Sequence, residues 1–268
     1  MTIPRFSLSQ ITTLGWTLEQ DLEAYVAAGV PALGVSLAKL RTAGMARGVR
    51  LLRACGLPVS CVTSSGPIPL DDPARAAGAV AAAREHLAVA AELGAACLML
   101  LPGAAPGLPW DEAARRAREH VEALRADARR LGVRLALEPV SQLRMDLCFL
   151  QSFHDALDFA DAIGAPEVGV VLELNNAWIE RHLDADIRER SARIAVVQVS
   201  DFKVGTLRAS ERVMIGDGDI PLRRLCGALA AAGYDGWYDI EILGPAIEAA
   251  GYAQVVPQAL ARFRGLWT

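Results

Sequence analysis

The feature of this sequence that most constrains its fold is a regular alternation between short apolar runs and longer Ala/Leu/Arg-rich segments. In the longer segments the apolar positions recur at helical spacing. Eight short runs predict β-strands: FSLSQIT, ALGVS, LPVSCVT, ACLMLLP, VRLALEP, VGVVLEL, IAVVQVS and GWYDIEI. Eight helices are expected to follow them in turn, at residues 18–28, 44–55, 73–93, 111–131, 152–163, 183–190, 221–232 and 253–263.

Helix-end signals support this alternation. Asp72 before Pro73 is typical of an N-cap followed by a first-turn proline. A glycine follows six of the expected helices, where a left-handed residue is needed: Gly29, Gly56, Gly94, Gly132, Gly164 and Gly233. The average unit has about 33 residues, which is the size of one unit of a closed (β/α)8 barrel.

We therefore predict an α/β fold, a single (β/α)8 TIM barrel, with residues 1–268 forming one domain. The alternative is a doubly wound open sheet. Such a sheet usually carries a glycine-rich phosphate loop after its first strand, and the corresponding junction here reads SQITTLGWTLEQ.

Composition narrows the class of protein. The chain is 53% hydrophobic and 22% charged, with a formal net charge of -4, so a basic nucleic-acid-binding face is not expected. All 27 basic residues except Lys39 and Lys203 are arginine, which we interpret as compositional drift. Five irregularly spaced cysteines favour a reducing cytoplasm. We find neither a signal-peptide pattern nor an apolar run that approaches the roughly 18 residues of a membrane span.

Polar side chains end four consecutive predicted strands, where the active site of such a barrel is expected. They are Glu138, Glu173, Gln198 and Glu241. Three carboxylates beside buried strand residues would repel one another unless a cation compensated them. An all-oxygen donor set favours one divalent metal ion, Mn or Mg, with Co also considered, over Zn. The alternative is that arginines in the barrel mouth pair with one or two of these acids.

Five segments resemble the sugar phosphate isomerase/epimerase family, also called the xylose isomerase-like TIM barrel superfamily. They are ALEPV (136–140), VGVVLELNN (168–176), VVQVSD (196–201), GDGDIPL (216–222) and AAGYDGWYDIEI (231–242). In that family a glutamate, an aspartate, a histidine or glutamine, and a glutamate end strands five to eight and bind one divalent metal. The resemblance therefore implies that the metal ligands are Glu138, Glu173, Gln198 and Glu241. In this chain Glu173 replaces the usual aspartate, and Asn176 replaces a substrate-contacting histidine of many epimerases.

The resemblance also implies an activity: a divalent-metal-dependent isomerase or epimerase acting on a small keto sugar or hydroxy keto acid through an enediolate intermediate. Glu138 and Glu241 would serve as its catalytic base and acid, in either order. Side chains near the strand ends and on the loop 202–217 are candidates for substrate binding, through hydrogen bonds, stacking or positive charge. These candidates are Asn176, Trp178, Lys203 and Arg212.

Two other functions stay open. One is a lyase, a dehydratase or a C-glycoside deglycosidase-type subunit that eliminates from an oxidised sugar; such deglycosidases use a small partner subunit. The other is a non-catalytic binding barrel without metal, which Glu173 and Asn176 keep open. The expected partner is a small carbohydrate-like substrate, with no nucleic acid and no membrane, and the chain itself is expected to form a homodimer or homotetramer.

Overall fold

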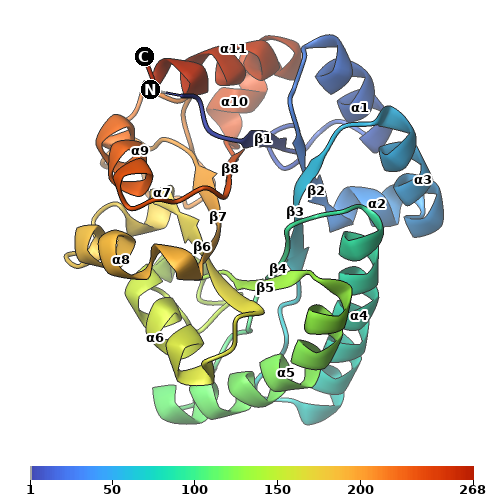
Figure 1. Ribbon diagram of the computed structural model, residues 1–268, viewed down its shortest axis with the longest axis vertical. Coiled ribbons are helices and arrows are strands. Elements are labelled where there is room, and N and C mark those ends of the chain that lie inside the picture. The colour runs from blue at the N-terminus through green and yellow to red at the C-terminus, as the bar shows by residue number, and fades with distance from the viewer. Residues whose placement is uncertain (1) are drawn as a thin grey trace.

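The computed structural model describes residues 2–268, and a closed barrel of eight parallel strands lies at its centre (Figure 1). The strands are β1 (Phe6–Ser9), β2 (Leu33–Ser36), β3 (Val59–Ser65), β4 (Cys97–Leu100), β5 (Arg134–Leu137), β6 (Val168–Glu173), β7 (Ile194–Val199) and β8 (Trp237–Ile240). Each strand pairs with the next, and β1 pairs with β8. The predicted (β/α)8 TIM barrel is confirmed.

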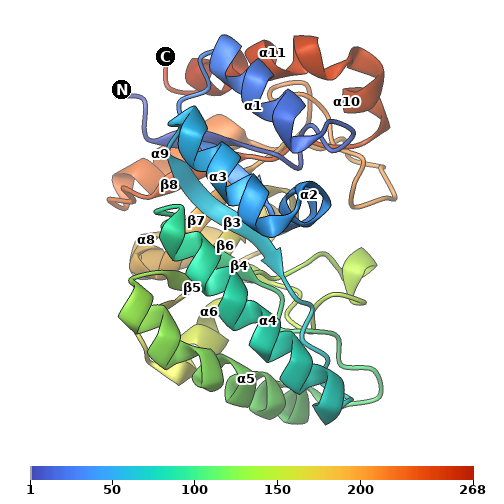
Figure 2. The same ribbon diagram turned by 90° about the vertical axis from the view of Figure 1, so that its right-hand side faces the viewer.

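Helices surround the barrel and run back along its outside (Figures 1 and 2). They are α1 (Leu18–Ala27), α2 (Leu37–Ala43), α3 (Met45–Cys55), α4 (Pro73–Glu92), α5 (Trp110–Leu131), α6 (Phe153–Ile163), α7 (Leu174–Ala177), α8 (Leu183–Arg190), α9 (Leu222–Ala231), α10 (Pro245–Ala250) and α11 (Tyr252–Gly265). Two short 3-10 turns, η1 (Gln142–Arg144) and η2 (Ser191–Arg193), complete the set. The three helices that were not predicted, α2, α7 and α10, are too short to show a helical period.

Local capping explains where several helices begin and end. The Asp72 side chain accepts hydrogen bonds from the backbone N–H groups of Ala74 and Arg75, as its position before Pro73 predicts. At the other end of a helix, Gly132 follows α5 with a φ of 69°, in the left-handed region that favours glycine. These boundaries direct the chain back into the barrel after each helix.

The barrel interior contains a buried carboxyl group below the mouth. Asp239 on β8 is fully buried, and its Oδ1 accepts a hydrogen bond of 2.6 Å from the Ser7 hydroxyl. Gly34 makes room for it, because a Cβ there would lie 2.6 Å from both carboxyl oxygens. Burial raises the pKa of Asp239 to about 7. The interior is therefore not a purely apolar core.

The barrel closes through aromatic packing between the two ends of the chain. The ring of Phe263 on α11 lies 4.7 Å from that of Phe6 on β1 and 6.0 Å from that of Tyr238 on β8. Trp267 packs against Tyr238 at 5.5 Å. The first and last parts of the described chain accordingly lie side by side in Figures 1 and 2.

All five cysteines are free thiols, four of them buried. Across residues 2–268, none of the helices combines the length and the apolar character needed to cross a membrane. The cytoplasmic location stays a prediction.

Candidate functional site

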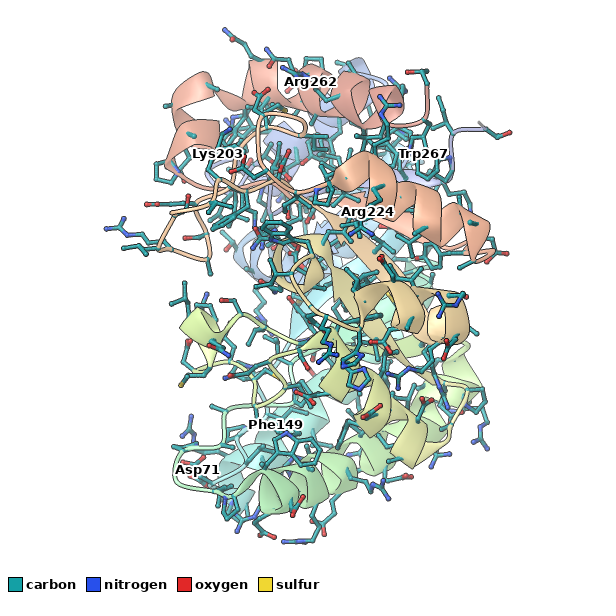
Figure 3. All side chains as sticks on the ribbon, turned by 90° about the vertical axis from the view of Figure 1, so that its left-hand side faces the viewer. Asp71, Phe149, Lys203, Arg224, Arg262 and Trp267 are labelled. Carbon is teal, nitrogen blue, oxygen red and sulfur yellow. The ribbon has the colours of Figure 1, made fainter. Side chains whose placement is uncertain are left out.

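The loops that follow the strands gather on one side of the barrel, at the right in Figure 2 and at the left in Figure 3. On that side a small cavity of about 140 Å³ opens between the ends of β5, β6 and β8. Its lining includes Glu138, Glu173, Asn176, Arg212 and Glu241. Trp267 lies on the opposite side, at the upper right in Figure 3.

Glu173 is the last residue of β6, and the strand register places it beside Gln198 on β7. Its Oε1 accepts hydrogen bonds from the Ser200 hydroxyl at 2.9 Å and from the backbone N–H of Asn175 at 3.0 Å. The second bond caps the short helix α7. Oε2 lies 2.9 Å from Nη1 of Arg212. The carboxylate is thus buried and held by three donors.

Glu241 directly follows β8 and is buried across the cavity. Its Oε2 accepts a hydrogen bond of 2.6 Å from Nε2 of Gln198, and its Oε1 lies 3.3 Å from Nη1 of Arg212. Burial raises the pKa of Glu241 to about 8; Arg212 opposes this rise, and the neighbouring carboxylates of Glu173 and Glu138 add to it. Glu241 can therefore bind or release a proton near neutral pH.

Arg212 enters the cavity from the loop between β7 and α9. Its backbone N–H donates to the carbonyl of Leu243 at 3.0 Å, and its Nη1 donates to the carbonyl of Glu241 at 2.8 Å. Burial would lower the pKa of this guanidinium, but the carboxylates of Glu173 and Glu241 raise it. For Glu173 and Glu241 the structure therefore shows the alternative expectation, in which an arginine in the barrel mouth pairs with the strand-end acids.

Carboxyl groups outnumber guanidinium groups in the cavity. Glu138, Glu173 and Glu241 line it, and of its two arginines Arg144 is paired with Asp146. In addition, Oε1 of Gln198 is buried and has no hydrogen-bond partner among the described residues. Both observations fit a divalent cation with oxygen ligands.

The four strand-end residues do not form a ready-made metal site in this conformation. Within the part of the chain that the structure describes, no three His, Cys, Asp or Glu side chains converge to hold a metal ion. Arg212 contacts two of the four predicted ligands, Glu173 and Glu241. The predicted ligand set of Glu138, Glu173, Gln198 and Glu241 thus stays a prediction.

Asp201 organises the loop that carries Arg212. Its buried carboxylate accepts hydrogen bonds from four backbone N–H groups, those of Phe202, Gly216, Gly218 and Ile220, at 2.8–3.3 Å. A Cβ at Gly218 would lie 1.9 Å from Oδ1 of Asp201, which explains the second glycine of GDGDIPL. No role was predicted for Ser200 or Asp201, the two polar residues that directly follow β7.

The predicted substrate-binding residues separate into two groups. Asn176 and Arg212 line the cavity. Lys203 and Trp178 are not among its lining residues. The Lys203 side chain is exposed, with Nζ 3.9 Å from Oδ1 of Asp219, and lies on the outer part of its loop (Figure 3). Trp178 is half-buried and packs against the hydrophobic core.

Comparison with known families identifies the family of this chain. A model of the family described as "Xylose isomerase-like TIM barrel" matches residues 22–264. The chain belongs to the xylose isomerase-like TIM barrel family. The family resemblance predicted from the strand-end motifs is confirmed.

Individual relatives of this xylose isomerase-like barrel include an inosose isomerase from Halalkalibacterium halodurans. It is 27% identical over 122 residues, which are 44% of this chain and 42% of that protein, so the match spans less than half of its length. The crystal structure of protein SMc04130 from Sinorhizobium meliloti 1021 has a TM-score of 0.91 at 26% identity and covers 99% of both chains.

A structure of the IolI protein with a bound zinc atom has a TM-score of 0.87 at 17% identity and covers 98% of this chain and 97% of its own. At that identity the likeness is one of fold alone.

Proposed function

We propose that this chain is an isomerase or epimerase of a small keto sugar or hydroxy keto acid. One observation carries the proposal: the carboxyl groups of Glu138, Glu173 and Glu241 line one small cavity at the strand ends. Carboxyl groups on two sides of a bound substrate can act as its general base and general acid. The match to an inosose isomerase over part of the chain supports the same reaction class.

Glu138 and Glu241 are the proposed proton carriers. They follow β5 and β8 and line the same cavity, so a substrate carbon between them could lose its proton to the carboxylate of one and receive a different proton from the carboxylic acid of the other. Removal of the proton next to a carbonyl gives an enediolate. Return of the proton to the other face of the same carbon epimerises the substrate, and return to the neighbouring carbon isomerises it.

We propose one divalent metal ion, Mn or Mg, held by Glu138, Glu173, Gln198 and Glu241. When bound, it would stabilise the negative charge that develops on the substrate oxygens. The excess of carboxyl groups over guanidinium groups in the cavity lining and the unsatisfied Oε1 of Gln198 support this cation. The zinc atom in the IolI structure supports a divalent ion in a barrel of this fold.

The substrate would be oriented by Asn176 and Arg212, which offer an amide and a guanidinium to hydroxyl or carbonyl oxygens. A cavity of about 140 Å³ suits a small polyol rather than an oligosaccharide. Lys203 and Trp178 lie outside the cavity lining, so their contact with substrate stays a prediction.

Exchange of substrate hydrogen with solvent tests this function. The protein is incubated in D2O with Mn²⁺ and a panel of ketoses and inososes, and NMR follows deuterium entry next to the carbonyl together with the products. We expect exchange and a new isomer, and a loss of at least about 100-fold in Glu138→Gln and in Glu241→Gln. Glu248→Gln, on the exposed surface of α10, is the control.

Other outcomes of this experiment would overturn the proposal. Products that have lost a β-substituent would identify the lyase alternative. Absence of exchange with the whole panel, or full exchange in both glutamine variants, would contradict an isomerase that uses these carboxylates.

A further inference from the structure

Arg212 occupies the position where two of the proposed metal ligands meet. Its single Nη1 atom lies 2.9 Å from Oε2 of Glu173, 3.3 Å from Oε1 of Glu241 and 2.8 Å from the carbonyl oxygen of Glu241. A divalent cation bound to both carboxylates would be in close contact with this guanidinium. The two positive charges would repel each other strongly in a buried cavity of low dielectric constant.

The Arg212 side chain is held less completely than its backbone. The backbone N–H of Arg212 donates to Leu243, and the next residue, Val213, donates to the carbonyl of Asp201 at 3.0 Å. In the side chain, by contrast, Nε is buried without a hydrogen-bond partner among the described residues. The loop is thus fixed at this point, while the guanidinium has an unsatisfied donor that another position could satisfy.

We propose that Arg212 is an internal counter-ion that a divalent cation must displace from Glu173 and Glu241. In the metal-free protein the guanidinium compensates the two carboxylates. Binding of the cation releases it into the cavity, where it is available to an oxygen of the substrate. Metal therefore binds before substrate, and the two events are linked through one side chain. The inference rests on the proposed function, because it takes the metal ligands from there.

Chemical modification of the unaltered protein tests the displacement directly. Phenylglyoxal reacts with accessible arginines, and peptide mapping by mass spectrometry resolves Arg212 from Arg208. We expect Arg212 to be protected in EDTA and to react several-fold faster in saturating Mn²⁺ or Mg²⁺. Arg208, which is exposed on the same loop, should react equally in both conditions.

Metal affinity provides the second measurement. Isothermal titration calorimetry with Mn²⁺ should give a Kd about 10-fold lower for Arg212→Met than for the wild type, which is an ordinary coupling between two sites. Arg208→Met should leave the Kd unchanged. A methionine has a similar length to the aliphatic part of arginine and carries no charge, so it removes the competing cation.

The outcomes separate this inference from the proposed function. If Mn²⁺ binds but Arg212 reacts equally or more slowly in its presence, the displacement is wrong and the metal site stands. The same holds if the Kd of Arg212→Met equals or exceeds that of the wild type. If neither Mn²⁺ nor Mg²⁺ binds the wild-type protein, the proposed metal and this inference both fail. Proton exchange by Glu138 and Glu241 is then judged by the NMR experiment alone.

Discussion

At the scale of single residues, the buried carboxyl groups of this barrel differ in the groups that compensate them. Glu173 is compensated by a hydroxyl, a backbone N–H and a guanidinium. Asp239 has no cationic partner among the described residues, and its hydrogen-bond donors include the Ser7 hydroxyl and the Cys61 thiol. Burial raises the pKa of Asp239, because desolvation penalises the charged form and neutral donors offset only part of the penalty.

We predict that Asp239→Asn reduces the pH dependence of stability. The pKa of Asp239 rises from 3.8 to about 7 in the folded protein, so the folded state binds this proton more tightly than the unfolded state. The resulting stabilisation is complete below pH 3.8 and is lost as the pH rises through about 7. Between pH 4 and pH 8 the wild type should lose up to about 4 kcal/mol more stability than the variant.

Urea denaturation of EDTA-treated protein across this pH range measures the effect. Asp217→Asn, an exposed residue paired with Arg262, should keep the wild-type slope. An equal slope in Asp239→Asn and wild type would show that Asp239 ionises normally.

The strand-end acids could be predicted from the sequence because their signal is local: one polar residue that ends an apolar run. The partners of these acids could not. Arg212 is 39 residues after Glu173, and their contact depends on the path of the loop, which has no periodic pattern. The path of the chain also explains why the side chains of Lys203 and Trp178 do not line the cavity, although both residues are close to strand ends in sequence.

The loop from β7 to α9 is the element on which the site most depends. The Asp201 carboxylate accepts hydrogen bonds from backbone N–H groups near both ends of this loop, and Arg212 lies between those ends. The motif GDGDIPL was useful for recognising the family, and the structure supplies its physical meaning: closely spaced N–H groups that converge on one carboxylate.

We predict that Asp201→Asn lowers the free energy of unfolding by about 1–3 kcal/mol, since an amide can accept at one oxygen only and leaves buried N–H groups unsatisfied. Arg212 should also become reactive toward phenylglyoxal in the absence of metal. Asp219→Asn, on the exposed part of the same loop, is the control, and an equal loss of stability in both variants would contradict a special role for Asp201.

Gly218→Ala should be similarly destabilising, because the added Cβ would collide with the Asp201 carboxylate. Gly227→Ala is the matched control: it lies within α9, no atom lies within 4 Å of its added Cβ, and alanine is favoured in a helix. Thermal unfolding of the two variants should therefore shift in opposite directions. A neutral Gly218→Ala would show that the loop adjusts without Asp201.

At the scale of the whole molecule, closure of the barrel joins the beginning of the described chain to its end. The alternation of strands and helices predicted the number and order of the units, because each unit carries its own periodicity. Strands β1 and β8 pair although nearly the whole chain separates them in sequence. Their pairing was therefore inferred from the number of units and not from a local pattern.

We predict that Phe263→Ala lowers the free energy of unfolding by about 3–5 kcal/mol, the usual cost of removing a buried aromatic ring. Phe263 is fully buried between β1 and β8, so its loss weakens the seam that closes the barrel. Leu207→Ala, on an exposed loop, should change stability by less than about 0.5 kcal/mol. Chemical denaturation compares the two, and equal effects would mean that α11 does not secure the seam.

The candidate metal ligands and proton carriers come from β5 to β8 alone, between Glu138 and Glu241. The loops after β1 to β4 face the same mouth and supply none of them. The residues that line the cavity come from the same half of the chain. Sequence changes in the loops after β1 to β4 would therefore leave every candidate ligand and proton carrier in place.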